Sequence, residues 1–389
     1  MSLDFEPVGR YLKSPSWSFF LFGPRGTGKS TWTQLTYPHA LRIDLLIPDS
    51  FRRYSAKPER LIEVLTGNPD IRTVIVDEVQ KAPALLPVIH ALIEEKRGLS
   101  FVLTGSSSRK LKRTGADLLA GRAVMRTLHP FMAAELASRF DFDRALRHGL
   151  LPLVHYADDP EDVLAAYAAL YMREEVQMEG LVRNIGDFSR FLEAISFSHA
   201  GVLNLNNVAR ECEVGRKVVE AYLEILEDLL LSFRLPVFTK RAKRATSAHP
   251  KFYLFDAGIF RSLRPCGPLD RPEEIDGPAL EGLVAQHLRA WNAYSGDRHD
   301  LAFWRTRSGL EVDFVLHGPE GFWVLEVKNS RRVRDEDLRG LRAFREDYPE
   351  AKALFIYRGE ERLLRNDILC LPCEEFLRGL VPGNPLERP

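Results

Sequence analysis

The sequence predicts an α/β protein that begins with a doubly wound parallel sheet, continues into a helical region and ends in a second α/β domain. Short apolar runs at residues 19–22, 72–76 and 99–103 alternate with segments of helix length. That alternation is typical of parallel strands joined by crossover helices. A further group of strand patterns follows between residues 301 and 357. Because 389 residues is long for one hydrophobic core, we expect three domains. Their expected bounds are 1–135, 136–255 and 256–389.

The composition restricts the class of protein. The chain has 54 Lys and Arg against 54 Asp and Glu, so any nucleic-acid contact needs a local basic patch. Four scattered cysteines argue for a reducing compartment rather than a disulfide scaffold. Cys370 and Cys373 have the spacing of half a zinc site, but no second Cys or His pair lies near them. Without a secretory signal or a bilayer-length apolar stretch, we expect a cytoplasmic protein with no membrane partner.

The first strand pattern runs directly into a glycine-rich motif. Residues 23–30 read Gly-Pro-Arg-Gly-Thr-Gly-Lys-Ser, which fits the P-loop pattern Gly-x-x-x-x-Gly-Lys-Ser. Glycines let backbone N–H groups surround a phosphate, Lys29 would reach the β- and γ-phosphates of ATP, and Ser30 would bind Mg²⁺. The alternative is a glycine-rich turn that only resembles such a loop. The residues expected to contact the nucleotide here are Gly23, Pro24, Arg25, Gly26, Thr27, Gly28, Lys29, Ser30 and Thr31.

The second and third strand patterns end in polar residues, which would meet this loop at the carboxyl edge of the sheet. Asp77 would hold Mg²⁺ beside Ser30, and Glu78 would polarise the attacking water. The alternative role for this acidic pair is to cap the helix that follows. At the end of the third strand, Thr104 or Ser106 would sense the γ-phosphate, with Thr104 preferred.

Arginines after the third strand are candidates for a cation that stabilises the transition state of hydrolysis. Arg122 is the first choice and Arg113 the second, supplied by the same chain or by a neighbouring subunit. A homo-oligomer is therefore plausible. The alternative for each arginine is an ordinary surface salt bridge.

Taken together, these motifs resemble those of the prokaryotic AAA-type ATPases. The stretches that carry the resemblance are residues 23–30, 76–83, 103–108 and 119–123. More closely, they look like the branch that is joined to a C-terminal domain of formerly unknown function. The resemblance implies an ATPase fold, with ATP and Mg²⁺ as cofactors and the roles given above.

The middle of the chain suggests a winged helix-turn-helix. A short helix capped by Asn206 or Asn207, a tight turn and a longer amphipathic helix precede two strand patterns at 233–237 and 251–255. As a DNA reader, this unit would put Arg216 and Lys217 at the start of the recognition helix and the basic residues of 240–244 against phosphates. As a packing module, it would only support its neighbours, and acidic residues on the longer helix favour that alternative.

The last third brings acidic residues to positions where burial is costly. Gly277-Pro278 would start a helix that carries Glu281 at the edge of its buried stripe. Asp313 falls in the middle of a strand pattern. On the next strand, Glu326 and Lys328 share a face because side chains alternate with period two. One face would therefore collect all four charged side chains.

These four residues suit metal-dependent hydrolysis of a phosphodiester. The carboxylates of Glu281, Asp313 and Glu326 would bind Mg²⁺ or Mn²⁺, and Lys328 would orient or deprotonate a metal-bound water. The alternative is an ion-pair cluster that binds no metal. Asp followed by Glu-x-Lys on the next strand is similar to the signature of the PD-(D/E)xK nuclease fold, although the leading proline is absent. The C-terminal domain of the ATPase branch named above resembles this fold through residues 304–306, 311–314 and 325–328.

The sequence thus predicts an ATP-hydrolysing protein coupled to a metal-dependent nuclease that cleaves DNA. The expected catalytic residues are Glu78, Asp313, Glu326, Lys328 and Glu281. The first alternative is an ATP-dependent switch that binds nucleic acid or a partner through an inactive nuclease-like domain. The second is a nucleotide-driven regulator that reads DNA through the middle region.

Overall fold

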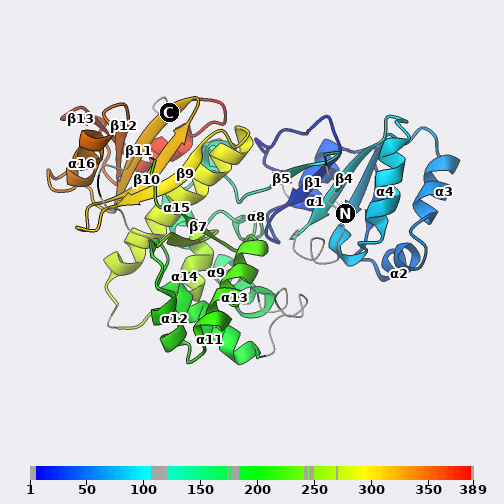
Figure 1. Cartoon of the computed structure of the whole chain (residues 1–389), viewed down its shortest axis with the longest axis horizontal. Coiled ribbons are helices and arrows are strands. Elements are labelled where there is room, and N and C mark those ends of the chain that lie inside the picture. The colour runs from blue at the N-terminus through cyan, green and yellow to red at the C-terminus, as the bar shows by residue number, and fades with distance from the viewer. Residues whose placement is uncertain are drawn as a thin grey trace. The chain divides into compact units, whose positions relative to one another are not determined.

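The computed structural model describes two compact units of the chain, whose elements are labelled in Figure 1. The smaller unit comprises Leu12–His129 and Asp228–Leu230, and the larger unit comprises Met1–Tyr11, Pro130–Glu227 and Leu231–Pro389. No helix among the described residues is both long and apolar enough to cross a membrane. The residues that the structure describes are 6–106, 119, 121–172, 176, 184–240, 244, 249–268 and 270–386.

The smaller unit is built on a five-stranded parallel sheet, which confirms the predicted sheet type. The strand order is β2-β3-β4-β1-β5, and every neighbouring pair is parallel. The three predicted strand patterns form β1, β3 and β4. The outer strands β2 and β5 were not predicted, because neither carries the continuous run of buried apolar residues that marks the central strands. The strands are β1 (Phe19–Phe22), β2 (Leu41–Asp44), β3 (Thr73–Asp77), β4 (Ser100–Gly105) and β5 (Val124–Thr127).

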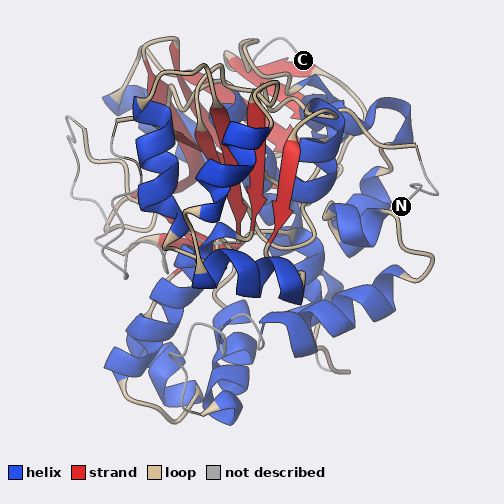
Figure 2. Cartoon of the chain, turned by 90° about the vertical axis from the view of Figure 1, so that its right-hand side faces the viewer, coloured by secondary structure: helices blue, strands red, loops and turns tan. Residues whose placement is uncertain are grey.

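Helices cover both faces of this sheet, because its central strands alternate apolar side chains to either side. Phe20 and Phe22 belong to a core cluster with Leu61 of α3 and Ile89 of α4. On the opposite face, the ring of Phe19 lies 6.3 Å from that of Trp32 in α1. Helices lie on both sides of the strands in Figure 2. The helices are α1 (Lys29–Thr36), α2 (Pro48–Ala56), α3 (Arg60–Gly67), the 3-10 turn η1 (Val79–Lys81) and α4 (Leu85–Glu94).

The first part of the larger unit is mostly helical and ends in a small antiparallel sheet. Strand β8 (Lys251–Leu254) lies between β6 (Gly201–Val202) and β7 (Ser232–Leu235), so the predicted pairing of the two later strands is confirmed. The helices before it are α6 (Ala133–Leu136), η2 (Ala137–Arg139), α7 (Phe142–His148), α8 (Pro152–His155), α9 (Pro160–Ala166), η3 (Tyr167–Tyr171), α11 (Ile185–Ser196), α12 (Leu205–Glu211) and α13 (Arg216–Asp228).

The start of α12 corrects the predicted helix cap. The side chain of Asn204 accepts hydrogen bonds from the backbone N–H groups of Asn206 and Asn207, at 3.1 and 3.2 Å. Asn204 is therefore the N-cap, two residues earlier than the earlier of the two predicted positions. Residues 204–207 contain three asparagines, and the sequence does not show which of them is the cap.

The second part of the larger unit is built on a six-stranded mixed sheet in the order β13-β14-β12-β11-β10-β9. Strands β9, β10 and β11 are antiparallel, while β11, β12 and β14 run parallel. Trp304 packs with Phe344 and Tyr348 in the core beside α16. The strands are β9 (Asp300–Arg305), β10 (Glu311–Gly318), β11 (Gly321–Lys328), β12 (Lys352–Tyr357), β13 (Leu363–Arg365) and β14 (Ile368–Pro372). The helices are α14 (Ala257–Leu263), α15 (Pro272–Tyr294), α16 (Arg339–Asp347) and α17 (Cys373–Gly379).

Helix α15 corrects a second prediction. It begins at Pro272 and continues through Pro278, where the sequence predicted its start. Proline fits the first turn of a helix best, so the later proline was the misleading signal. As a result, Glu281 lies in the helix interior, too far from the N-terminus to be stabilised by the helix dipole.

The two C-terminal cysteines are buried free thiols. Cys370 lies in β14 and Cys373 begins α17. Burial raises the pKa of both thiols, which disfavours the thiolate form that binds metal.

Candidate functional site

The glycine-rich loop joins β1 to α1 at the carboxyl edge of the parallel sheet. Gly26 and Gly28 have φ values of 81° and 87°, in the left-handed region that side chains disfavour. A Cβ atom at Gly23 would lie 2.5 Å from the carbonyl oxygen of Leu128. The shape of the loop therefore requires glycine at positions 23 and 28, the two that define the motif.

Lys29 is held inside this loop as the first residue of α1. Its ammonium group donates to the carbonyl oxygens of Gly23 and Pro24, at 2.6 and 3.1 Å. The Thr27 hydroxyl donates to the same Pro24 oxygen at 2.7 Å. These contacts fix a buried cation where the loop N–H groups and the start of a helix would surround a phosphate.

Three oxygen-bearing side chains meet beside the loop. The Ser30 hydroxyl donates to one carboxylate oxygen of Asp77 at 2.7 Å, and the Thr104 hydroxyl donates to the other. Asp77 ends β3, and Thr104 lies near the end of β4. Hydroxyl and carboxylate oxygens are the donors that Mg²⁺ prefers, so Ser30 and Asp77 fit the predicted ion. The structure thus brings together the residues that the motifs predicted for this site.

Glu78 follows Asp77 in a backbone conformation that is uncommon outside glycine, with φ of 58°. The side-chain amide of Gln80 donates to the Glu78 carboxylate and, at 3.3 Å, to the Ser106 hydroxyl. A side chain at Gly105 would collide with Gln80. Gln80 therefore orients Glu78, a role that the sequence analysis did not assign. The Asp-Glu-x-Gln spacing was the available signal.

Arg122 lies at the amino ends of the parallel strands, whereas the loop lies at their carboxyl ends. It precedes β5, whose first residue, Val124, pairs with the first residue of β1. Its guanidinium forms an ion pair with Glu94 at the end of α4. Within its own chain, Arg122 is thus remote from Lys29, which corrects the prediction of a role in cis. Arg113, the second candidate, lies outside the described residues.

The larger unit contains a buried cluster of charged side chains around Lys251. This lysine begins β8, and its side chain is 2% exposed. Its ammonium lies 2.8 Å from an oxygen of Glu281 in α15, 2.7 Å from one of Glu311 and 2.8 Å from one of Asp313. Glu311 and Asp313 both belong to β10. An ammonium has three donors, and each is matched here by a carboxylate.

A second contact holds each of these three carboxylates. The Tyr253 hydroxyl, on the same strand as Lys251, donates to Glu281 at 2.5 Å. The backbone N–H of Val327 donates to Asp313 at 2.9 Å, and Arg305 pairs with Glu311 at 3.1 Å. The pairing of β10 with β9 also shifts register between Val312 and Val315, a bulge of the kind that re-aims a side chain. The cluster is therefore built from several elements at once.

Glu326 and Lys328 extend the cluster on β11. The Lys328 ammonium lies 2.5 Å from one oxygen of Glu326, as expected for two residues on one strand face. The other Glu326 oxygen is buried and has no hydrogen-bond partner among the described residues. Burial, followed by the nearby charge of Asp313, raises the pKa of Glu326 well above its usual range. The neutral form of this side chain is thus favoured.

Among the other carboxyl groups of the cluster, the pKa of Glu281 is also raised, whereas that of Asp313 is lowered. Burial, with the charge of Asp313, raises the pKa of Glu281 to about 7. Burial opposes ionisation of Asp313 too, but Lys251 and Lys328 outweigh it and lower its pKa. Burial would lower the pKa of Lys251, yet Asp313 and Glu281 raise it well above its usual value. The centre of the cluster is therefore a charged Lys251–Asp313 pair.

The residues predicted to hold a nuclease metal ion do not fit one in this arrangement. A divalent ion needs several oxygens directed at one point. Glu281 and Asp313 instead direct an oxygen at Lys251, and Glu326 directs one at Lys328. Across the described part of the chain, no three His, Cys, Asp or Glu side chains form a group able to hold a metal ion. We therefore derive no metal-dependent step from this cluster.

The basic residues of the predicted wing are paired with acids where they are described. Lys240 lies 2.6 Å from Asp300, and Arg244 lies 2.6 Å from Glu346. Arg241 and Lys243 lie outside the described residues. On α13, Arg216 pairs with Glu220 at 2.9 Å. These pairs weaken the prediction that the wing and the recognition helix contact phosphates.

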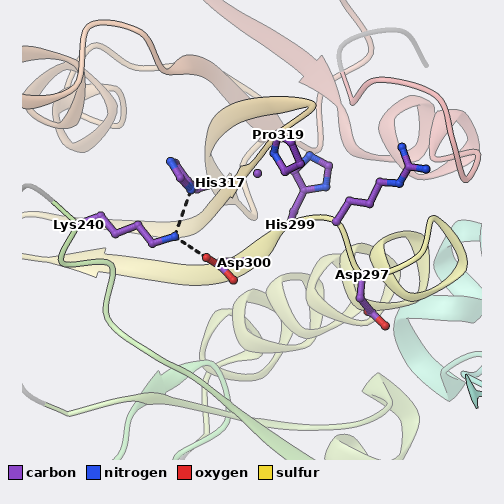
Figure 3. Close-up of a pocket in the computed structure, with 8 residues that line it drawn as sticks. Lys240, Asp297, His299, Asp300, His317 and Pro319 are labelled. Atoms are coloured by element: carbon purple, nitrogen blue, oxygen red, sulfur yellow. Dashed lines mark hydrogen bonds and ion pairs between the residues drawn. The ribbon is translucent and has the colours of Figure 1, made fainter. Parts of the chain in front are cut away.

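A pocket with a volume of about 280 Å³ lies beside Lys240. Figure 3 shows the Lys240 ammonium between Asp300 and His317, which also line it. The pocket lies where β9 begins and β10 ends, since His317 pairs with Asp300. The carboxylate cluster lies toward the other end of these strands, roughly 20 Å away over six residues. The pocket is therefore not part of the cluster.

Three family models match consecutive parts of the chain. Residues 17–137 match an AAA domain. Residues 139–270 match a domain of unknown function (DUF8612), and residues 276–376 match another (DUF4143). The matches support an AAA-type ATPase. Together with the five-stranded parallel sheet, they support a P-loop ATPase-like fold, nucleotide binding with Mg²⁺, and ATP hydrolysis.

Similar proteins are found in bacteria and archaea. Uncharacterized proteins of Mycobacterium tuberculosis and Mycobacterium bovis are each 27% identical over 371 residues, covering 92% of this chain and 80% of theirs. An uncharacterized protein of Methanocaldococcus jannaschii is 22% identical over 285 residues, covering 66% of this chain and 61% of its own.

Two solved structures are similar over parts of the chain. The replication initiator DnaA bound to AMPPCP and single-stranded DNA has a TM-score of 0.28 and 12% identity, covering 56% of this chain and 83% of its own. A Vibrio cholerae protein has a TM-score of 0.21 and 13% identity, covering 79% and 88%. Similarity at this level does not indicate a function for this chain.

Sequence reasoning missed three members of the cluster. They are Lys251, Tyr253 and Glu311. One signal was available for the first, because residues 251–255 read Lys-Phe-Tyr-Leu-Phe. A lysine at the start of such an apolar strand needs a buried partner.

Proposed function

We propose that this protein is an ATP-driven switch: the smaller unit hydrolyses ATP, and a nuclease-like domain in the larger unit binds DNA without cutting it. The hydrogen bonds that join Ser30, Asp77 and Thr104 beside the Lys29 loop are the observation that carries the ATPase half. The ammonium of Lys251 among three carboxylates favours binding over cleavage.

Each residue of the nucleotide site has a defined role in this proposal. The loop and Lys29 bind the phosphates, and Thr104 contacts the γ-phosphate. Ser30 and Asp77 would hold Mg²⁺, which supplies charge neutralisation on the phosphates. Glu78, held by Gln80, orients a water molecule toward the γ-phosphorus and accepts its proton. A new P–O bond forms to the water oxygen, and the bond to ADP breaks.

An arginine from a neighbouring subunit completes this proposal. Arg122 is too far from its own loop but lies on the surface of its unit, where a second copy can reach it. We therefore keep a homo-oligomer in the proposal, with Arg122 acting in trans.

The DNA-binding half is supported by exposed arginines at the same edge as the carboxylate cluster. Arg307 lies in the turn between β9 and β10, and Arg331 and Arg332 follow the end of β11. Three exposed guanidinium groups suit contacts to phosphates, which position a duplex without reading its sequence.

The helix pair α12–α13 followed by β7 and β8 supports a winged helix-turn-helix within this unit. Three of its described cations, Arg216, Lys240 and Arg244, pair with acids, so we assign it a packing role rather than DNA reading. Strand β8 of this element carries Lys251, whose ammonium pairs with the carboxylates of the cluster. The element therefore packs against the last domain through a buried ion pair.

A metal-dependent DNA nuclease is the second candidate. It is supported by Asp313 and the Glu326–Lys328 pair on neighbouring strands, the arrangement that the nuclease signature implies. Coupled to ATP hydrolysis, this candidate requires Mg²⁺ or Mn²⁺ at the cluster.

One assay separates the two candidates. Plasmid and branched DNA are incubated with the full chain, Mg²⁺ or Mn²⁺, and ATP, ADP or no nucleotide, while binding is followed by filter retention. The switch predicts ATP hydrolysis and salt-dependent retention of intact DNA. Cleavage that disappears in Asp313→Asn, while ATP hydrolysis persists, would establish the nuclease instead. Retention that is unchanged in an Arg307→Ala, Arg331→Ala, Arg332→Ala triple variant would exclude the proposed DNA surface.

A further inference from the structure

The position of Lys251 in the fold is fixed by backbone pairing rather than by its side chain alone. Strand β8 is the middle strand of its sheet, so Lys251 pairs with Leu235 of β7 on one side and with Val202 of β6 on the other. A side chain that projects from such a strand has a set direction. The ammonium is therefore delivered to the cluster by a rigid element and not by a mobile loop.

The contacts of this ammonium are those expected of a bound cation. It meets three carboxylate oxygens from two different elements, at 2.7 to 2.8 Å. Its side chain is almost completely buried, as is that of Asp313. Burying either charge alone is strongly unfavourable, so each requires the other.

The charges of the cluster are nearly balanced while Lys251 is present. With Glu326 neutral, the carboxylates of Glu281, Glu311 and Asp313 face three cations, Lys251, Lys328 and Arg305. A divalent ion added to this set would lie within a few ångströms of the Lys251 ammonium and be repelled by it. Without Lys251, the same carboxylates would carry an excess of negative charge that a divalent ion could neutralise.

One oxygen of the cluster has no partner at all among the described residues. It is the second carboxylate oxygen of Glu326, a side chain that is 8% exposed. Together with the oxygens that Lys251 now contacts, it offers an additional ligand to a metal ion.

We propose that Lys251 is a built-in cation that occupies the carboxylate cluster and excludes divalent metal ions from it. The expected nuclease metal site is thus filled by the protein's own strand β8. Replacing the ammonium with a neutral side chain converts the cluster into a site for Mg²⁺ or Mn²⁺. This inference concerns metal binding alone and does not depend on ATP hydrolysis or DNA binding.

The test measures Mn²⁺ binding by electron paramagnetic resonance and calorimetry, without nucleotide. The full chain carries Asp77→Asn throughout, so that the nucleotide site does not contribute. With Lys251 present, we expect no Mn²⁺ bound at the cluster. With Lys251→Met added, we expect one Mn²⁺ per chain, bound at least about tenfold more tightly than by the parent chain, a difference of about 1.4 kcal/mol. Adding Asp313→Asn to that variant should abolish the gain.

Lys240→Met is the matched control, because Lys240 pairs with Asp300 in the same unit but far from the cluster. It should create no Mn²⁺ site. Lys251→Gln is the second variant if Lys251→Met does not fold, since its amide still donates hydrogen bonds to carboxylates. In either folded Lys251 variant, Mn²⁺ should raise the melting temperature, whereas it should leave that of the parent chain unchanged.

Two results would overturn the proposal. The first is a Mn²⁺ ion that binds with Lys251 in place and is lost on Asp313→Asn. The second is a folded Lys251 variant that binds no Mn²⁺ and is not stabilised by it.

Discussion

Two aspartates lie on strands of two different sheets, Asp77 at the end of β3 and Asp313 near the start of β10, and their partners differ in charge. Asp77 accepts hydrogen bonds from the neutral hydroxyls of Ser30 and Thr104. Asp313 accepts them from the Lys251 ammonium and a backbone N–H. A carboxylate that only hydroxyls contact keeps its negative charge available to a cation, whereas one paired with a buried ammonium is already neutralised.

The lysines of the two regions explain this difference. Lys29 donates to the backbone carbonyls of Gly23 and Pro24 and therefore does not neutralise Asp77, which we propose as a Mg²⁺ ligand. Lys251 donates to the carboxylates themselves. A lysine that contacts the backbone leaves a nearby carboxylate able to bind a metal ion. A lysine that contacts the carboxylate itself takes the place of that ion.

The largest effect is expected at the nucleotide site. Lys29→Ala should reduce ATP turnover by at least about a hundredfold, because it removes a preorganised positive charge from the phosphate site. Glu78→Gln should reduce turnover similarly while retaining ATP binding. Steady-state kinetics and binding of a fluorescent ATP analogue distinguish the two. Turnover that survives Lys29→Ala would contradict the assignment of this loop.

The next largest effect is expected at Asp313. Asp313→Ala leaves Lys251 without its most buried partner and should lower the free energy of unfolding by about 3–5 kcal/mol. Urea denaturation measures this change. Asp77→Ala should lower stability less, since it leaves neutral hydroxyls, rather than a buried ammonium, without a partner. If the two variants lost equal free energies of unfolding, the charge of the partner would not distinguish Asp313 from Asp77.

A pH dependence of stability is expected from Glu281. Its pKa is raised to about 7 in the folded chain, above the ordinary value, so the folded state binds a proton that the unfolded state releases. The stability that this proton contributes is therefore fully present at low pH and is lost as pH rises from about 4.5 to about 7.

Glu281→Gln should flatten this part of the stability curve, as urea denaturation at several pH values would reveal. The lowered pKa of Asp313 acts in the opposite sense and in a lower window, below its ordinary value of about 3.9. A slope that is unchanged in Glu281→Gln would show that Glu281 does not titrate there.

The smallest effect is expected at the exposed pair of Lys240 and Asp300. Lys240→Ala should change the free energy of unfolding by less than about 1 kcal/mol, because an exposed ion pair gains little in water. Lys251→Ala should cost several times more. Thermal unfolding of both variants makes this comparison, and similar losses would argue that burial does not decide the strength of these pairs.

Local motifs determined much of the nucleotide site in advance. Residues 23–30, Asp77 and Thr104 were predicted from strand patterns and motif spacing, and the structure brings them together. This succeeded because parallel strands deliver their carboxyl ends to one edge of a sheet. The same geometry explains why the prediction for Arg122 was wrong in cis. Arg122 precedes β5 and therefore lies at the amino ends of the parallel strands, away from the loop.

The carboxylate cluster shows what a sequence cannot supply. Glu281, Asp313, Glu326 and Lys328 were predicted from period-two and helical patterns, and all four do lie in one cluster. Lys251 lies 30 residues before Glu281 and 62 before Asp313, and no local pattern connects it to either. The sequence by itself put Glu281, Asp313 and Glu326 at positions facing a core, because helical periodicity and alternation along a strand decide which side chains face inward. Only the tertiary structure decided that their partner is an ammonium, because the packing of β8 against α15 and β10 brings it there.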